Sequence, residues 1–370
     1  MKLLDRYLAR EILLPFGAGV LFLTQLLLAT QILSQAKVLF GSAVSLWDVG
    51  SVIVFMMPHF LGYVLPIAFL LGAVLGIARL SEDREVVALG AAGISPVRLV
   101  PVPVAAGLLV AAFGVWLSVE VEPRALDAAT DQLVEVVKKN VRSDVKEGTF
   151  YDQIAGFVLY AQRVKDGRWE NVLVYDRTDP DAAVLALARR GRLEPVGRGQ
   201  DMRLVLEDGE VHREDGGSDD YVIAGYARAE VVLGIGSVFA ERSALVRASS
   251  DTLDELSEGA RAARAKGDLG LARRLEGILH RKISAPLAVL PFALLAVPFG
   301  ASRRGGRAFG IGAMIAAVVA HYILLRLGEV AAQRGVAPAA LALELPNLAL
   351  GALGVVLLVL QARRGAGAVR

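Results

Sequence analysis

The chain has 370 residues, no cysteine and a formal net charge of +2. It therefore has no disulfide, no thiolate metal site and no strongly basic field of the kind that attracts nucleic acid. Its hydrophobic fraction of 55% exceeds the about 45–50% of soluble domains. These values exclude a disordered or collagen-like chain, and the concentration of apolar residues in charge-free runs favours a membrane protein.

Six apolar runs are long enough, or nearly long enough, to cross a membrane as helices, which takes about 20 residues. They cover residues 12–36, 49–78, 99–119, 283–302, 308–325 and 345–362. The first run is too long for the apolar part of a signal peptide and lacks a convincing cleavage site, so it is predicted to be a retained anchor. Residues 1–119 and 281–370 therefore each carry three predicted spans around an insert, 120–280.

Lysine and arginine are unevenly shared between the two ends of these runs. Twelve lie in the segments at one end, whereas the short loops at the other end carry only Lys37, Arg326 and Arg334. Since short cytoplasmic loops are enriched in Lys and Arg, both termini are predicted to be cytoplasmic and the insert to lie outside.

The insert shows short strand-like segments separated by turn residues. These segments cover residues 157–161, 172–175, 184–188, 202–206, 221–224 and 229–233. The pairs Asp166-Gly167 and Asp208-Gly209 are typical of hairpins, and Asp215-Gly216-Gly217 indicates a longer loop. The pattern predicts an antiparallel sandwich, open barrel or jellyroll. Helices are expected on both flanks, at 123–141 and at 251–280, the second broken near Gly267 and Gly270.

The sequence lacks the motifs of several kinds of catalytic and binding site. No phosphate-binding P-loop and no H-E-x-x-H zinc motif is present, and the four histidines are scattered. Only His59 and His321 lie well within the apolar runs, which contain no carboxylate; for both, core packing is favoured over a relay role. We therefore expect no catalytic residue, no metal and no cofactor, and an energy source borrowed from a partner at a cytoplasmic loop.

The segment between the second and third runs, about residues 81–95, suits such a contact. Ser81 is predicted to cap a short helix whose first turn is acidic, as the helix dipole favours. Val86, Leu89 and Gly93 share one stripe, and Gly93 is expected to end the helix. An ordinary connecting helix explains the same pattern equally well.

At this segment the sequence resembles the lipopolysaccharide export permeases LptF and LptG, whose coupling helix is similar to residues 85–95. The resemblance extends along most of the chain, and the insert is similar mainly in size and strand content. Further similar segments are Asp5-Arg6-Tyr7-Leu8, Val64-Leu65-Pro66, Ala285-Pro286-Leu287, Val297-Pro298-Phe299-Gly300 and Leu345-Pro346-Asn347-Leu348.

The resemblance implies six membrane helices with an inserted all-β periplasmic jellyroll, in a multi-pass protein of the bacterial inner membrane. It implies a heterodimer of an LptF-like and an LptG-like permease subunit, driven by an LptB-like ATPase dimer. The pair would extract lipopolysaccharide and pass it to LptC-like and LptA-like bridge proteins. The start of the chain and the fourth span favour LptF over LptG.

The resemblance also suggests sites. ATPase coupling is expected at Glu82, Arg84, Glu85, Leu89 and Gly93. Headgroup phosphates are expected at Lys37, Arg281, Lys282 and Arg326, although these side chains could simply snorkel at span ends. The family often has basic residues earlier in the first span, where this chain has Gln31 and Ser34, which leaves Lys37 as the nearest substitute. Acyl chains are expected along Met202, Leu204 and Leu206, which would equally suit a folded core.

Two other functions compete with transport. One is a membrane scaffold or mechanotransducer that an ATPase drives without moving lipid. The other is an intramembrane enzyme, which is disfavoured because no paired carboxylates, Ser/His pair or metal ligands are visible in the runs.

Overall fold

The computed structural model describes residues 2–34, 45–144, 147–151, 156–165, 168–177, 183–196, 201–214, 221–233, 250–301 and 306–367. The chain forms two compact units. The helical unit consists of Met1–Ala29, Met56–Leu126 and Ala248–Arg370, and the sheet unit of Thr30–Phe55 and Asp127–Arg247.

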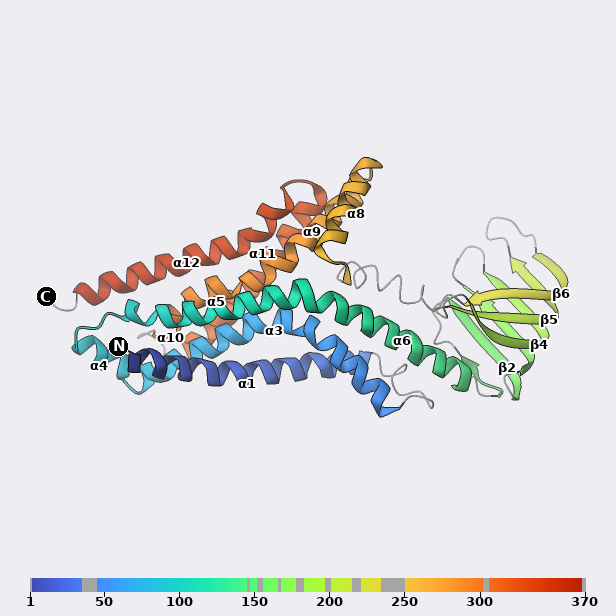
Figure 1. The fold of residues 1–370 in the computed structure, drawn as a ribbon, viewed down its shortest axis with the longest axis horizontal. Coiled ribbons are helices and arrows are strands. Elements are labelled where there is room, and N and C mark those ends of the chain that lie inside the picture. The colour runs from blue at the N-terminus through green and yellow to red at the C-terminus, as the bar shows by residue number, and fades with distance from the viewer. Residues whose placement is uncertain are drawn as a thin grey trace. The chain divides into compact units, whose positions relative to one another are not determined.

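Six stretches of helix in the described part of the chain are long and apolar enough to cross a membrane, as predicted (Figure 1). They are Leu3–Leu33, Leu46–Glu82, Pro96–Leu133, Leu269–Gly300, Ala308–Arg334 and Ala339–Arg363. The helices that build or flank them are α1 (Lys2–Ser34), α3 (Leu46–Glu82), α4 (Glu85–Ala91), α5 (Pro101–Trp116), α6 (Glu122–Asp144), α8 (Leu253–Ala265), α9 (Leu269–Leu287), α10 (Val289–Gly300), α11 (Gly306–Arg334) and α12 (Ala339–Gly367). Most spans extend beyond the charge-free runs, because helices continue into the polar flanks.

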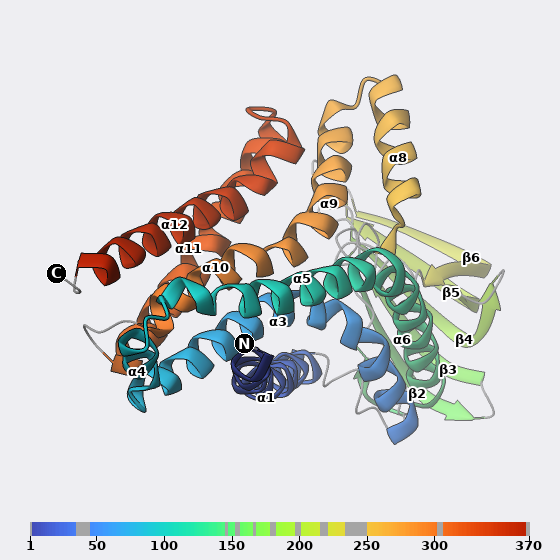
Figure 2. The ribbon, with the colours of Figure 1, turned by 60° about the vertical axis from the view of Figure 1, so that its left-hand side comes forward.

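The core of the helical unit is built around α10, which packs against α5, α11 and α12 (Figure 2). On one side of α10, Ala293 and Val297 pack with Phe69 of α3. On the other side, Phe292 and Leu295 pack with a second cluster of residues. Because both clusters meet on α10, the fourth span is the most buried of the six.

Two glycines on α3, one helical turn apart, let α1 approach closely. A Cβ atom at Gly72 would lie 2.6 Å from the backbone of Phe16, and one at Gly76 would lie 2.5 Å from the carbonyl oxygen of Glu11. This is the G-x-x-x-G arrangement that brings membrane helices together without bulky side chains between them.

The inserted domain is all-β, as predicted. Its strands are β1 (Phe150–Tyr151), β2 (Phe157–Lys165), β3 (Arg168–Asp176), β4 (Val184–Val196), β5 (Asp201–Glu214) and β6 (Tyr221–Leu233). The described strands form one antiparallel sheet in which each strand pairs with the next along the chain. All six predicted segments lie in strands, and the last two belong to the single strand β6. Asp166-Gly167 and Asp215-Gly216-Gly217 lie outside the described residues.

The hairpin predicted at Asp208-Gly209 is wrong, because this pair lies inside β5. Asp208 adopts a left-handed conformation with φ 56°, which aspartate tolerates in strands as well as in turns. Gly209 is paired with Tyr226 of β6, whose hydroxyl donates a hydrogen bond of 2.8 Å to the carbonyl oxygen of Leu187 in β4. The glycine therefore makes room for a cross-strand tyrosine rather than for a turn.

The two helical flanks of the insert are confirmed. The third span continues without a break into α6. On the other flank, α8 ends before Gly267, which has φ 80°, and Gly270 falls inside α9 instead of breaking it. Thr252 and Glu255 form a capping box at the start of α8.

Candidate functional site

The third span contains a π-helical turn, Leu117–Val121, between α5 and α6. Such turns are rare and often mark functional positions. Here the turn is followed directly by Glu122, and both Ser118 and Glu122 are buried, with 6% and 8% of their surfaces exposed. The structure thus buries a carboxylate in the third span.

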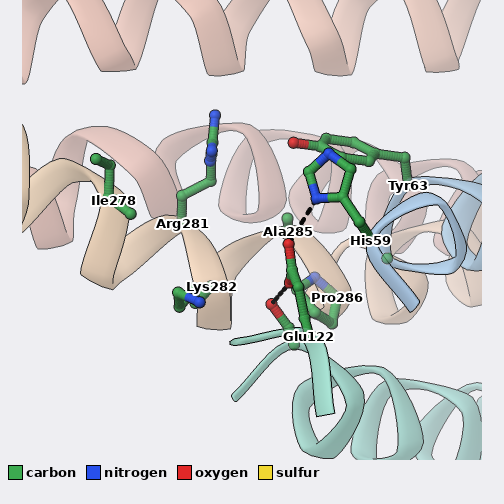
Figure 3. A pocket seen from close by; sticks show the side chains of 10 residues that line it. His59, Tyr63, Glu122, Ile278, Arg281, Lys282, Ala285 and Pro286 are labelled. Carbon is green, nitrogen blue, oxygen red and sulfur yellow. Dashed lines mark hydrogen bonds and ion pairs between the residues drawn. The ribbon is translucent and has the colours of Figure 1, made fainter. Parts of the chain in front are cut away.

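Glu122 is held from two sides (Figure 3). The hydroxyl of Ser118 donates a hydrogen bond of 2.9 Å to Oε2, and Oε1 lies 2.7 Å from Nδ1 of His59 on α3. That distance is typical of a hydrogen bond between an imidazole and a carboxylate. His59 therefore partners a carboxylate, which differs from the simple core packing expected for it.

The sequence analysis missed Glu122 because the charge-free run stops at residue 119, whereas the candidate span reaches Leu133. The available signal was an acidic residue within one helical turn of the end of a span. It became informative only when α3 brought His59 to the same place.

Two basic residues of α9 lie beside this carboxylate. Lys282 is buried, with 6% of its surface exposed, and it lines a narrow cleft together with His59, Ser118, Glu122 and Arg281. A buried ammonium group costs several kcal/mol unless charged or polar partners compensate for it. Acidic and basic side chains therefore line this cleft together and compensate for one another's burial.

A second cleft of about 270 Å³ adjoins the first, because Arg281 lines both. There Arg281 lies 3.4 Å from Glu329 of α11, which also forms an ion pair with Arg326. The structure thus brings together three of the four predicted headgroup residues, Arg281, Lys282 and Arg326. The fourth, Lys37, lies outside the described residues.

His321 of α11 lines the second cleft and is 3% exposed. Its ring meets Phe292 and Tyr322 edge-on, at centroid distances of 5.4 and 5.5 Å. Its Nδ1 has no hydrogen-bond partner among the described residues. The aromatic contacts agree with the expected core packing, and the unpaired nitrogen adds a polar group to the wall of the cleft.

The charged residues of both clefts share one level along the helices. Glu122, Arg281 and Arg326 lie roughly 20 residues, or about 30 Å at 1.5 Å per residue, from Pro101 at the start of α5, Gly300 at the end of α10 and Gly306 at the start of α11, respectively. That length is about the thickness of the hydrocarbon core. The clefts therefore lie at the end of the spans that is opposite to α4.

At the α4 end, the predicted short helix is present but begins later than expected. Ser81 lies inside α3, and α4 starts at Glu85 after Arg84, which has φ 58°. The prediction that Ser81 caps this helix is wrong, because α3 continues through it. The predicted end is confirmed: Gly93 has φ 79°, and the amide of Ile94 bonds to the Leu89 carbonyl at 2.9 Å.

Two of the residues predicted for coupling, Glu85 and Leu89, lie in α4, and the other three lie next to it. Leu89 is half-buried against the helical core, as is Val86. Glu82, Arg84 and Gly93 are exposed. Glu85 is half-buried and accepts a hydrogen bond of 3.1 Å from the Tyr7 hydroxyl of α1. Since no residue of α4 is fully buried, the helix is anchored by one stripe and open on the other.

The residues predicted for acyl chains belong to β5. Leu204 and Leu206 are fully buried in the apolar cluster on one face of the sheet. Met202 lies in β5, opposite Leu233 in the register, and its side chain lies outside the described part.

A comparison with models of protein families finds one match. The family described as "Lipopolysaccharide export system permease LptF/LptG" matches residues 6–359. The chain belongs to this family. A search of the curated proteins gives no match.

Membership of the LptF/LptG family makes the chain a multi-pass membrane permease of the lipopolysaccharide export system, the membrane subunit of an ABC transporter. The match spans both halves of the helical unit and the inserted sheet. The two clefts and α4 are thus parts of a permease, and their chemistry can be considered for lipid transport.

Proposed function

We propose that this LptF/LptG-family chain extracts lipopolysaccharide from the bacterial inner membrane and passes it to a periplasmic bridge, driven by a separate cytoplasmic ATPase. The observation that carries the proposal is the gathering of Arg281, Lys282 and Arg326 around adjoining clefts at one end of the spans. Phosphate groups bind most strongly to such paired guanidinium and ammonium donors.

In this proposal the clefts lie at the outer leaflet, where a lipid headgroup would meet them. The Lys and Arg bias between the two ends of the spans supports this orientation, with both termini cytoplasmic and residues 120–280 periplasmic. Lys37 would add a further cation near the outer end of the first span.

The ATPase, an LptB-like dimer, would dock on α4 and on the exposed residues that flank it, Glu82 at the end of α3, Arg84 and Gly93. Glu85 would contribute its charge at the edge of that contact, and Leu89 would transmit movement to the core against which it packs. Charged contacts of this kind fix the orientation of partners as well as their affinity.

The sheet would receive the lipid and pass it to LptC-like and LptA-like proteins. Its last strand, β6, lies at the edge of the sheet and exposes Tyr221, Val222 and Ile223. An exposed apolar edge strand is suited to pairing with a strand of another chain. Leu204 and Leu206 would lie along the apolar path.

A second permease chain of the same family would complete the conduit, and we favour the LptF-type role for this one. Exposed apolar side chains run along α1 and α11, among them Leu21, Phe22, Ile315 and Ile323. These side chains are suited to contact lipid acyl chains or an apolar helix of the second permease chain.

The test is transport by the reconstituted complex of both permeases, the ATPase and a soluble acceptor protein. We expect ATP-dependent transfer of lipopolysaccharide to the acceptor. Glu85→Lys should lower it at least about tenfold, equivalent to about 1.4 kcal/mol, and reduce copurification of the ATPase. Tyr7→Phe is the matched control, because it removes the hydrogen bond to Glu85 and keeps the charge. Wild-type activity and copurification in Glu85→Lys would contradict the coupling role.

The alternative function is a non-transporting scaffold that an ATPase drives. The half-buried stripe of α4 suits force transmission in either case, so copurification does not separate the two. If the complex hydrolyses ATP yet never delivers lipid to the acceptor, the scaffold is the better description.

A further inference from the structure

Lys282 lies near more than one charged side chain. Glu122 and Arg281 line the same cleft, and Asp251, which does not line it, also acts on the ammonium group electrostatically. Lys282 and Glu122 line the same cleft, and Figure 3 shows both in it, with Arg281 directed to the other side. The buried lysine and the buried glutamate therefore line one cleft and interact electrostatically.

We propose that Glu122 is an internal counter-ion for Lys282, which a phosphate of the bound lipid has to displace. The inference rests on the proposed function, because it concerns how the headgroup enters and leaves that site. It assigns a role to Glu122, His59 and Ser118, which are not among the proposed headgroup contacts.

Lys282 needs acidic neighbours. A buried cation without a compensating anion is strongly unfavourable; Glu122 and Asp251 both act on Lys282 electrostatically, and Glu122 is the one that shares its cleft. A phosphate that approaches Lys282 then meets a like charge, which opposes its binding.

His59 and Ser118 keep the Glu122 carboxylate hydrogen-bonded when a phosphate approaches Lys282. The carboxylate is already fixed by Ser118 at 2.9 Å and His59 at 2.7 Å, so it does not need Lys282 to remain partnered. The π-helical turn keeps Ser118 and Glu122 in this arrangement.

The consequence is a site of limited affinity. A transporter must bind its cargo firmly enough to load it and weakly enough to release it. An internal counter-ion favours release, because Lys282 still has the carboxylate of Glu122 beside it when the phosphate departs.

The test measures the affinity of the purified complex, in nanodiscs, for two probes: lipid A with both phosphates, and lipid A with its phosphates removed. Glu122→Gln should bind the phosphorylated probe about three- to tenfold more tightly, the range expected for loss of one nearby like charge. His59→Gln should bind it more weakly, and the double variant should match Glu122→Gln. Glu120→Gln is the matched control, because it removes the same charge from the exposed side of the same turn.

Weaker or unchanged binding of the phosphorylated probe by Glu122→Gln would overturn the inference. If that variant does not fold, His59→Gln decides, since it should lose affinity for the phosphorylated probe alone. Equal loss for both probes would indicate structural damage and contradict the counter-ion role. Wild-type complex that binds both probes equally would instead refute the proposed headgroup site.

Discussion

Tyr226 reaches from β6 across Gly209 of β5 to the Leu187 carbonyl of β4. A side chain at position 209 would occupy the space that the ring and the carbonyl oxygen use. Three strands are thus tied together at one glycine, next to the left-handed Asp208, which forms an ion pair with Arg190 at 2.7 Å. An aromatic ring over a strand glycine is a recognised way to fix register.

Gly209→Ala should therefore destabilise the sheet by about 1–3 kcal/mol, as overpacking does. The added methyl group would overlap the Leu187 carbonyl oxygen and the Tyr226 hydroxyl. Gly225→Ala is the control, because its methyl group would have nothing within 4 Å. The measurement is the resistance of the sheet domain to proteolysis during chemical denaturation, and equal effects of the two substitutions would refute the packing account.

Burial raises the pKa of the Tyr226 hydroxyl above its ordinary value. The folded sheet then holds the phenolic proton more tightly than the unfolded chain does, so the stabilisation is complete below pH of about 10 and is lost as the pH rises through the raised pKa. We expect the resistance of the sheet to denaturant to fall between neutral and strongly alkaline pH, and to fall less in Tyr226→Phe. A parallel decline in both proteins would show that Tyr226 is not responsible.

At the scale of elements, glycine decides how helices meet. Gly72 and Gly76 let α1 lie against α3 with backbone close to backbone, and Arg79 of α3 adds an ion pair of 3.0 Å to Glu11. The G-x-x-x-G spacing is present in the sequence, but many apolar helices contain it. The structure shows that in this chain the motif faces α1 and fixes where the first span lies.

Gly76→Val should separate α1 from α3, because its side chain would collide with the Glu11 carbonyl group. We expect loss of a disulfide crosslink engineered between the two helices, and a fall in thermal stability of about 1–3 kcal/mol. The control is Gly17→Val on α1, where an added Cβ has nothing within 4 Å. An intact crosslink in Gly76→Val would contradict this packing.

At the scale of the whole molecule, the distribution of charge predicts the direction of the chain in the membrane. Most Lys and Arg of the short segments lie at the α4 end, whereas the charges at the opposite end are gathered into two clefts with Glu122 and Glu329. Ion pairs occur at both ends, such as Arg79–Glu11 near α4 and Arg281–Glu329 in the second cleft, but only the opposite end places its cations around adjoining clefts.

Reporter fusions test this direction. A phosphatase reporter, active only outside the cytoplasm, should be active when fused within residues 150–240 and inactive when fused after residue 304 or at the C-terminus. The Lys and Arg bias is the physical reason. Activity in the reverse pattern would place the sheet in the cytoplasm and remove the basis for a periplasmic bridge.

The six spans, the inserted all-β domain and the end of α4 at Gly93 could be predicted from the sequence, whereas the role of Arg281, Lys282 and Arg326 stays a prediction. These follow from local properties: the length of apolar runs, strand periodicity, glycine conformation and charge near span ends. The hairpin at Asp208-Gly209 and the cap at Ser81 failed because the same local signals fit a strand interior and a continuing helix.

Only the tertiary structure decided that Glu122 is buried, that His59 and Ser118 hold it, and that three cations from two helices surround adjoining clefts. His59 and Glu122 are 63 residues apart in the chain, and Arg281 and Glu329 are 48 apart. No local pattern specifies which distant helices touch, because that depends on how the spans pack around α10. The charges of this site acquire their partners, and so their chemistry, through that packing.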